Sequence, residues 1–187
     1  MNGKKLSEMT LEELWRLFPI FLTEHQSCWG IWFQDEQRLL RETISLPVQI
    51  YHVGSTAVQG IWAKPIVDIL IETENVEQVR EVSLCLQKAG YILMQETPLR
   101  CSLNKGYTEQ GFADRVFHFH VRSKGDIDEV YFKEYLNTHA EIAKAYEELK
   151  LSLWKQYEYD RDGYTNAKTE FVQKYTQIAK TDGAGTR

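Results

Sequence analysis

The feature that most constrains the fold is a carboxylate in the middle of an apolar run. Residues 66–72 read Ile-Val-Asp-Ile-Leu-Ile-Glu, a stretch rich in β-branched side chains that predicts a buried strand. Alternate side chains point to opposite faces of a strand, so Asp68 shares its face with Leu70 and Glu72. An ionised carboxylate among such neighbours is costly unless it is paired, hydrogen-bonded or bound to a metal. The sequence therefore predicts a partner for Asp68.

A short polar turn precedes this strand. Gly54, Ser55 and Thr56 follow a first apolar run, residues 48–53, which predicts a neighbouring strand. Gly54 lets the backbone approach a ligand closely, and the two hydroxyls add donors beside free backbone N–H groups, which together suit a phosphate. A phosphate cradle beside a carboxylate favours a nucleotide and Mg²⁺.

The same turn carries a family resemblance. The strings His-Val-Gly-Ser-Thr-Ala-Val-Gln-Gly at 52–60 and Ala-Lys-Pro-Ile-Val-Asp-Ile at 63–69 resemble the signature of the GrpB family, which is grouped with the nucleotidyltransferase-fold superfamily that includes DNA polymerase beta. The resemblance covers roughly residues 19–180, through segments 115–121, 132–136, 146–150 and 164–168. Some GrpB proteins are fused to dephospho-CoA kinase. The resemblance thus implies a nucleotide or a coenzyme-A-related small molecule as the ligand.

The chain departs from the polymerase-beta pattern at one position. In those enzymes two carboxylates two residues apart on the second strand hold the metals, because residues i and i+2 share a face. Here Leu70 occupies the second position. Glu72 shares the face of Asp68 but lies about 13 Å away at about 3.3 Å per residue, too far to share one metal without a bend. One carboxylate ligand is expected where a polymerase has two.

Two histidines are candidates to complete the site. His118 and His120 alternate with apolar residues and so project together from one strand, and His52 stands just before the turn. His118 and His120 with Asp68 predict a centre for a divalent metal, with His52 and Glu72 as possible further members. The metal would be Mg²⁺, or Mn²⁺ or Zn²⁺ given the histidines, because neutral imidazole is a poor Mg²⁺ ligand. One histidine could instead be a general base, or both could simply be satisfied by hydrogen bonds.

Several cations lie near the same segments. Lys64, Arg115 and Lys168 match positions of the GrpB motifs, and the resemblance implies that they bind phosphate. Converging donors are what phosphate recognition requires. The alternative for each is a salt bridge or a solvated surface charge.

Periodicity and capping signals predict the fold class. Strand, helix and strand are followed by antiparallel strands and then by helical spacing, which predicts an α+β fold: a mixed or antiparallel nucleotidyltransferase-like sheet packed with helices, plus C-terminal helices. We expect an N-terminal extension helix in residues 1–18, the domain in 19–180 and a disordered tail in 181–187. Residues 19–22 read as a short edge strand.

Charge and apolar content exclude some classes of function. The net charge of −5 among 187 residues argues against nucleic-acid binding and favours a small substrate. No apolar run approaches the about 18 residues of a membrane span, and the N-terminus lacks the apolar core of a signal peptide, so we expect a cytoplasmic protein without a membrane partner.

The sequence is compatible with three functions. The first is metal-assisted nucleotidyl or phosphoryl transfer, with Asp68, His118 and His120 as catalytic residues. The second is a non-catalytic nucleotide-binding or regulatory module, which Leu70 favours. The third is metal-dependent hydrolysis at a His–Asp centre. The sequence does not determine the substrate, the acceptor or the oligomeric state.

Overall fold

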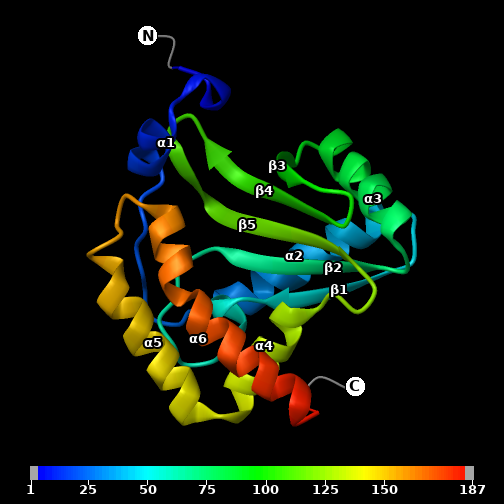
Figure 1. The fold of residues 1–187 in the computed structure, drawn as a ribbon. Helices are drawn as coiled ribbons and strands as arrows, with labels where there is room; N and C mark the ends of the chain where they lie inside the picture. The colour runs from blue at the N-terminus through cyan, green and yellow to red at the C-terminus, as the bar shows by residue number, and fades with distance from the viewer. Residues whose placement is uncertain (1–3, 184–187) are drawn as a thin grey trace.

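A five-stranded mixed sheet forms the centre of the computed structural model, which describes residues 4–183 (Figure 1). In the spatial order β1-β2-β5-β4-β3, the strands are Val48–Val53, Val67–Thr73, Gly111–Ser123, Arg100–Thr108 and Ile92–Glu96. β2 and β5 run parallel, and the other neighbours run antiparallel. The predicted α+β class with a mixed nucleotidyltransferase-like sheet is confirmed.

The parallel pair β2–β5 brings distant sequence segments together. A parallel neighbour cannot be joined by a hairpin, and here the chain forms α3 (Val76–Lys88), β3 and β4 before it returns as β5. In the resulting register Asp68 lies opposite His118, and Leu70 lies opposite His120. β4 contains Gly106, which has a φ of +89° and lies where the register between β4 and β5 shifts.

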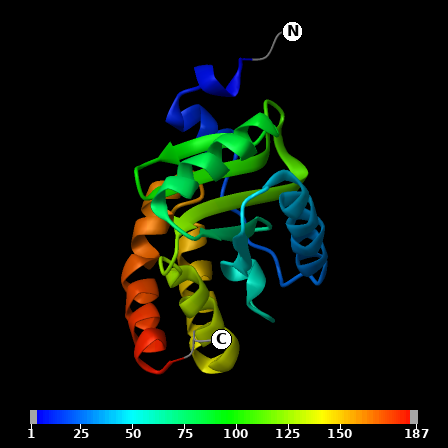
Figure 2. The same ribbon diagram turned by 90° about the vertical axis from the view of Figure 1, so that its right-hand side faces the viewer.

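One face of the sheet packs against α2 (Cys28–Thr43) and α3. The core on this side joins Trp29 and Leu40 of α2 to Val82 of α3 and to Ile69 and Phe119 of the sheet, all of which are fully buried. These strand residues occupy alternate positions, as the period of two predicts. Figure 2 shows α2, in blue, on the side of the sheet opposite the C-terminal helices.

The other face of the sheet is covered by α4 (Asp128–Thr138), α5 (Ala140–Trp154) and α6 (Arg161–Thr181). A second apolar cluster holds these helices to each other and to the segment before β2, through Phe132, Leu136 and Tyr146 together with Val58 and Ile61. Strand residues with the parity of Asp68 point toward these helices, so the sheet and the helices together enclose the candidate site.

The N-terminal extension contains a 3₁₀ turn, Leu6–Glu8, and the helix α1 (Leu11–Leu17), which begins with a Thr10–Glu13 capping box. Phe18 ends this segment and is 3% exposed, with its ring centroid 4.8 Å from that of Tyr107 and 5.0 Å from that of Phe112. The extension is therefore anchored on the β4–β5 hairpin through one aromatic side chain.

Two details differ from the sequence-based expectation. The predicted edge strand at 19–22 is wrong: the Ile20 N–H donates to the Glu158 carbonyl, and pairing is limited to an isolated bridge between Thr23 and Ala63. α6 continues to Thr181, and residues 184–187 of the expected tail lie outside the described part of the chain. Within residues 4–183, no helix combines the length and the apolarity that crossing a membrane requires.

The anchoring of the extension can be tested at Phe18. We expect Phe18→Ala to lower the free energy of unfolding by about 3–5 kcal/mol, the usual cost of emptying a buried aromatic site. The matched control is Leu11→Ala on the same extension, where the side chain is 64% exposed and the change should stay within about 0.5 kcal/mol. Urea denaturation measures both; equal effects of the two substitutions would contradict the anchoring.

Candidate functional site

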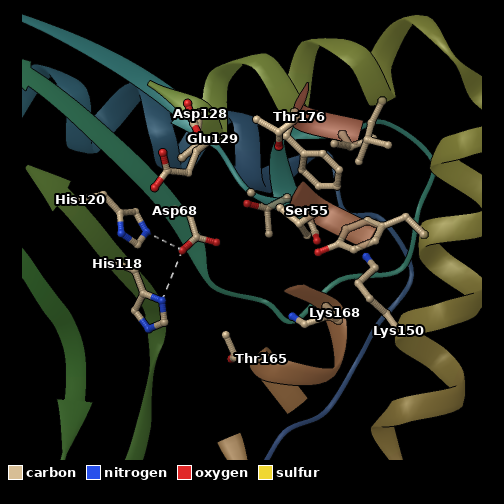
Figure 3. A pocket seen from close by; sticks show the side chains of 18 of the residues that line it. Ser55, Asp68, His118, His120, Asp128, Glu129, Lys150, Thr165, Lys168 and Thr176 are labelled. Atoms are coloured by element: carbon tan, nitrogen blue, oxygen red, sulfur yellow. Dashed lines mark hydrogen bonds and ion pairs between the residues drawn. The ribbon is translucent and has the colours of Figure 1, made fainter. Parts of the chain in front are cut away.

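A cavity of about 720 Å³ lies between the sheet and the C-terminal helices (Figure 3). Its wall is formed by the Gly54 turn, Asp68 near the start of β2, His118 and His120 of β5, and side chains from α4, α5 and α6. Most of the predicted site residues meet here: Gly54, Ser55, Thr56, Lys64, Asp68, His118, His120 and Lys168.

The carboxylate of Asp68 is held by both predicted histidines. Its Oδ1 lies 3.3 Å from His118 Nδ1 and 3.2 Å from His120 Nε2. The parallel β2–β5 register produces this arrangement because it sets residues 118 and 120 beside residue 68 with the same parity. Burial by itself raises the pKa of Asp68, but the two imidazole hydrogen bonds outweigh it and hold the pKa far below its ordinary value. Asp68 is therefore ionised at neutral pH.

Gly54 is required by the position of this carboxylate. The residue has φ +71°, and a Cβ placed on it would lie 2.4 Å from Asp68 Oδ2. The backbone therefore closes directly against the carboxylate before the 3₁₀ turn Ser55–Ala57 begins. The Ser55 hydroxyl is hydrogen-bonded to Tyr146, which fixes the turn against α5.

Three lysines, here called the lysine wall, line the same cavity: Lys64, Lys150 and Lys168. Among the described residues, no carboxylate lies within ion-pair distance of their ammonium groups. Burial, reinforced by repulsion from Lys168, lowers the pKa of Lys64 and of Lys150 from 10.5 to about 7. Burial likewise lowers the pKa of Lys168 to about 8. The lysine wall thus holds three buried ammonium groups that form no ion pair within residues 4–183, although Asp68 attracts Lys64 and Lys168 at longer range.

A tyrosine whose hydroxyl has no hydrogen-bond partner also lines the cavity. Tyr164 is 1% exposed, and its buried hydroxyl makes no hydrogen bond in the described structure. The Nζ atoms of Lys168 and Lys64 lie 4.0 and 5.4 Å from its ring centroid. Buried polar groups are normally paired, so the unpaired Tyr164 hydroxyl is an unfavourable feature of this part of the cavity wall.

Three candidates lie outside the cavity. His52 pairs with Ile69 across β1–β2 and therefore shares the α2 face, where its ring stacks on Phe33 and its Nε2 lies 3.0 Å from Thr56 Oγ1. Burial lowers the pKa of His52 to about 4. Arg115 has the parity of the β5 core residues and pairs with Asp35 of α2 at 3.0 Å.

Glu72, the third of these, has the parity of Asp68 but lies further along β2. Its carboxylate accepts hydrogen bonds from the Tyr51 hydroxyl at 3.0 Å and the Gly125 N–H at 2.8 Å. These contacts hold the Glu72 side chain away from the cavity, and it is not among the residues that line the cavity.

Sequence reasoning missed Lys150, Tyr146 and Tyr164. A signal was present, because Tyr146 and Lys150 on α5 repeat the four-residue spacing of Tyr164 and Lys168 on α6. Residues i and i+4 of a helix share a face, so each pair presents an aromatic ring and an ammonium group together. Lys150 and Tyr146 show this, with Nζ 4.9 Å from the ring centroid.

The predicted metal centre can be compared with this geometry. Both imidazoles direct a nitrogen at Asp68 Oδ1, and a nitrogen that donates a proton to a carboxylate has no lone pair for a metal. Within residues 4–183, no three His, Cys, Asp or Glu side chains are grouped to hold a metal ion. As arranged, the residues do not fit a His₂Asp metal site; metal binding stays a prediction.

A mixed sheet with a Gly-Ser turn between its first strands and an aspartate on the second is the arrangement of a nucleotidyltransferase-like fold. The family model described as GrpB protein matches residues 19–178, and the chain belongs to the GrpB family. The chain is 32% identical over 161 residues to glutamate-rich protein GrpB of Alkalihalophilus pseudofirmus, covering 83% of this chain and 92% of that protein.

One relative is considerably longer than the region that this chain matches. The chain is 35% identical to UPF0157 protein PA4798 of Pseudomonas aeruginosa over 150 residues. This match covers 78% of this chain and 62% of that protein.

A crystal structure of conserved protein GrpB from Enterococcus faecalis matches with a TM-score of 0.74 at 27% identity, over 87% of this chain and 98% of that chain. Cid1, described as having RNA terminal uridylyl transferase activity, matches at a TM-score of 0.48 and 12% identity over 76% of this chain and 42% of that chain.

The contact between the turn and the carboxylate can be tested at Gly54. Gly54→Ala introduces a strained φ and a clash with Asp68. Gly60→Ala is the matched control, because φ there is +77° but no atom lies within 4 Å of the added Cβ. We expect Gly54→Ala to destabilise the protein by about 1–3 kcal/mol more than Gly60→Ala, the range for overpacking. Thermal unfolding measures the difference, and equal losses would show that the turn does not close on Asp68.

Proposed function

We propose that the protein binds a nucleotide or another phosphorylated small molecule in the 720 Å³ cavity, with the phosphates on the lysine wall. The observation that carries this proposal is that Lys64, Lys150 and Lys168 line one cavity and that none of them forms an ion pair within residues 4–183. Burying uncompensated ammonium groups destabilises a protein, and a polyanion that enters the cavity removes that cost.

The Gly54 turn supports the same ligand class from the other side of the cavity. Ser55 and Thr56 line the cavity, and the turn gives backbone N–H groups that can face an anion. Arg161, the first residue of α6, adds a further cation to the lining. Hydrogen bonds between such cations and phosphate oxygens are charge-assisted and stronger than neutral ones.

Leu70 favours a binding or regulatory role over two-metal nucleotidyl transfer. It is fully buried and packs with Val53 and Val130, so no carboxylate can occupy its position without refolding the local core. Asp68 stands alone on β2 at the site, and the second metal position of a two-metal clamp is not formed by this strand. A transferase remains the rival, and turnover of a labelled nucleoside triphosphate that is lost in Asp68→Asn would establish it.

Ligand binding can be measured by thermal stabilisation. ATP, UTP, dephospho-CoA and pyrophosphate, each with and without Mg²⁺ or Mn²⁺, form the test panel. A ligand present at a hundredfold excess over its dissociation constant should stabilise the protein by about 2.7 kcal/mol. No stabilisation by any phosphorylated compound, at concentrations up to the millimolar range, would refute the proposal.

The lysine wall is tested by Lys168→Met. We expect binding of the stabilising compound to weaken about 10–100-fold, since a hydrogen bond to a charged group contributes about 1.5–3 kcal/mol. The ligand-free variant should be at least as stable as the wild type, because a desolvated cation is removed. Lys174→Met is the matched control: it lies on the same helix α6, is exposed and does not line the cavity. Equal affinities of the two variants, measured by calorimetry, would place the phosphates elsewhere.

The pH dependence follows from the lowered pKa values of the lysines. Because Lys64 and Lys150 have a pKa of about 7 in the folded state and 10.5 ordinarily, the unfolded chain binds more protons between these values. The stability of the ligand-free protein should therefore rise with pH in this window. Anion affinity should instead fall as pH rises through about 7–8, where the lysines lose their charge. Sulfate, whose charge is constant there, is the suitable probe, and a pH-independent affinity between 6 and 9 would contradict the prediction.

A further inference from the structure

Asp68 uses its two carboxylate oxygens differently. Oδ1 lies within hydrogen-bond distance of both imidazoles, at 3.3 Å from His118 and 3.2 Å from His120. Figure 3 shows both dashed contacts converging on this oxygen, while the other oxygen, Oδ2, points away from the histidines into the cavity. The protonation of the two rings decides whether this arrangement is attractive.

A second hydrogen bond defines the tautomer of His120. The Nη2 of Arg122 lies 3.4 Å from His120 Nδ1. A guanidinium group only donates, so Nδ1 accepts and Nε2 carries the proton that is donated to Asp68. Arg122 is 6% exposed and is fixed by two backbone carbonyls, Cys101 O at 3.2 Å and Val121 O at 3.1 Å, so this donor has little freedom to move.

The tautomer of His118 is defined through a tyrosine. The Tyr107 hydroxyl lies 2.7 Å from His118 Nε2, and the same hydroxyl oxygen accepts a hydrogen bond from Arg161 Nη2 at 2.9 Å. Since the arginine occupies the acceptor side, the tyrosine proton is directed at His118 Nε2. His118 then carries its own proton on Nδ1, toward Asp68. This Nδ1–H form is the less common tautomer of a neutral imidazole in water, so it needs such a partner.

We propose that Tyr107, oriented by Arg161, and Arg122 are positioning residues that hold the two histidines in opposite tautomers. Both rings then donate to Asp68 Oδ1 and leave Oδ2 as a single acceptor facing the cavity. The group that Oδ2 accepts is a hydroxyl of the ligand, so the ligand is a phosphorylated molecule that also carries a free hydroxyl. The assignment of a ligand hydroxyl rests on the proposed function, whereas the assignment of the two histidine tautomers does not.

A hydroxyl fits Oδ2 better than a divalent cation does. Mg²⁺ requires near-octahedral oxygen coordination, and β2 supplies one carboxylate oxygen with Leu70 in place of a second acid. The charge of Asp68 already interacts with Lys64 and Lys168 across the cavity, so a neutral donor completes the site without adding positive charge to a wall that has an excess of it.

The tautomers can be observed in the ligand-free protein by long-range ¹H–¹⁵N NMR of the imidazole rings. We expect His118 as the Nδ1–H form and His120 as the Nε2–H form. In Asp68→Leu, which removes the acceptor, His118 should keep the Nδ1–H form; in the double variant Asp68→Leu/Tyr107→Phe it should revert to a mixture dominated by Nε2–H. Asp68→Leu/Tyr51→Phe is the matched control, since the Tyr51 hydroxyl binds Glu72 and touches neither ring. Asp68→Ala replaces the leucine variant if the backbone spectrum shows misfolding.

Two results would overturn the tautomer assignment. One is the same tautomer for both histidines in the wild type. The other is loss of the Nδ1–H form of His118 in Asp68→Leu while Tyr107 is intact, which would mean that the carboxylate alone sets the ring.

The hydroxyl is tested separately with glycerol 3-phosphate and propyl phosphate, which differ in their hydroxyl groups. We expect the glycerol compound to bind about 10–100-fold more tightly, the effect of one hydrogen bond to a charged acceptor. Equal binding would overturn the hydroxyl assignment. Absence of binding by both would overturn the hydroxyl assignment; it would refute the proposed phosphate site as well only if the nucleotide panel also failed to stabilise the protein. The NMR result on the free protein would stand in either case.

Discussion

The Asp68 carboxylate, bonded to two imidazoles on one oxygen and closed against Gly54 on the other side, is the interaction on which the site depends. A carboxylate facing the interior of the molecule loses much of its hydration, and only the two N–H donors make its ionised form favourable there. Both donors come from β5, so the carboxylate is stabilised only while β2 and β5 are paired in parallel in their observed register. The closure of the Gly54 turn, the pairing of β2 with β5 and the ionised state of Asp68 therefore depend on one another.

The lysines that line the cavity place positive charge near Asp68. Lys64 lies in the segment before β2, Lys150 on α5 and Lys168 on α6, so the helices that cover the sheet also supply the cations. Their desolvation opposes folding, and the apolar cluster around Phe132, Leu136 and Tyr146 must offset it. Natural proteins accept such local instability at binding sites, because a ligand of opposite charge recovers it.

Family membership and site chemistry answer different questions about this chain. The GrpB family and the nucleotidyltransferase-like sheet describe its architecture. The site departs from the polymerase-beta pattern, because Leu70 is buried with Val53 and Val130 where a second metal-binding carboxylate would stand. A fold of this kind supports several chemistries, and the groups around the cavity decide among them. Here those groups suit an anion and a hydroxyl better than a pair of metal ions.

The sequence by itself determined the strands, the turn and the common face of His118 and His120, because strand parity and β propensity act locally. The resemblance to the GrpB family implied their grouping with Asp68, which the parallel β2–β5 register produces. Parity could also have excluded His52 and Arg115, whose positions share the face of Ile69 and Phe117. Only the tertiary structure decided that Lys150 and Tyr164 line the same cavity as Asp68. Their helices are distant in sequence from β2, and helical periodicity defines which residues share a face but not the partner against which that face packs.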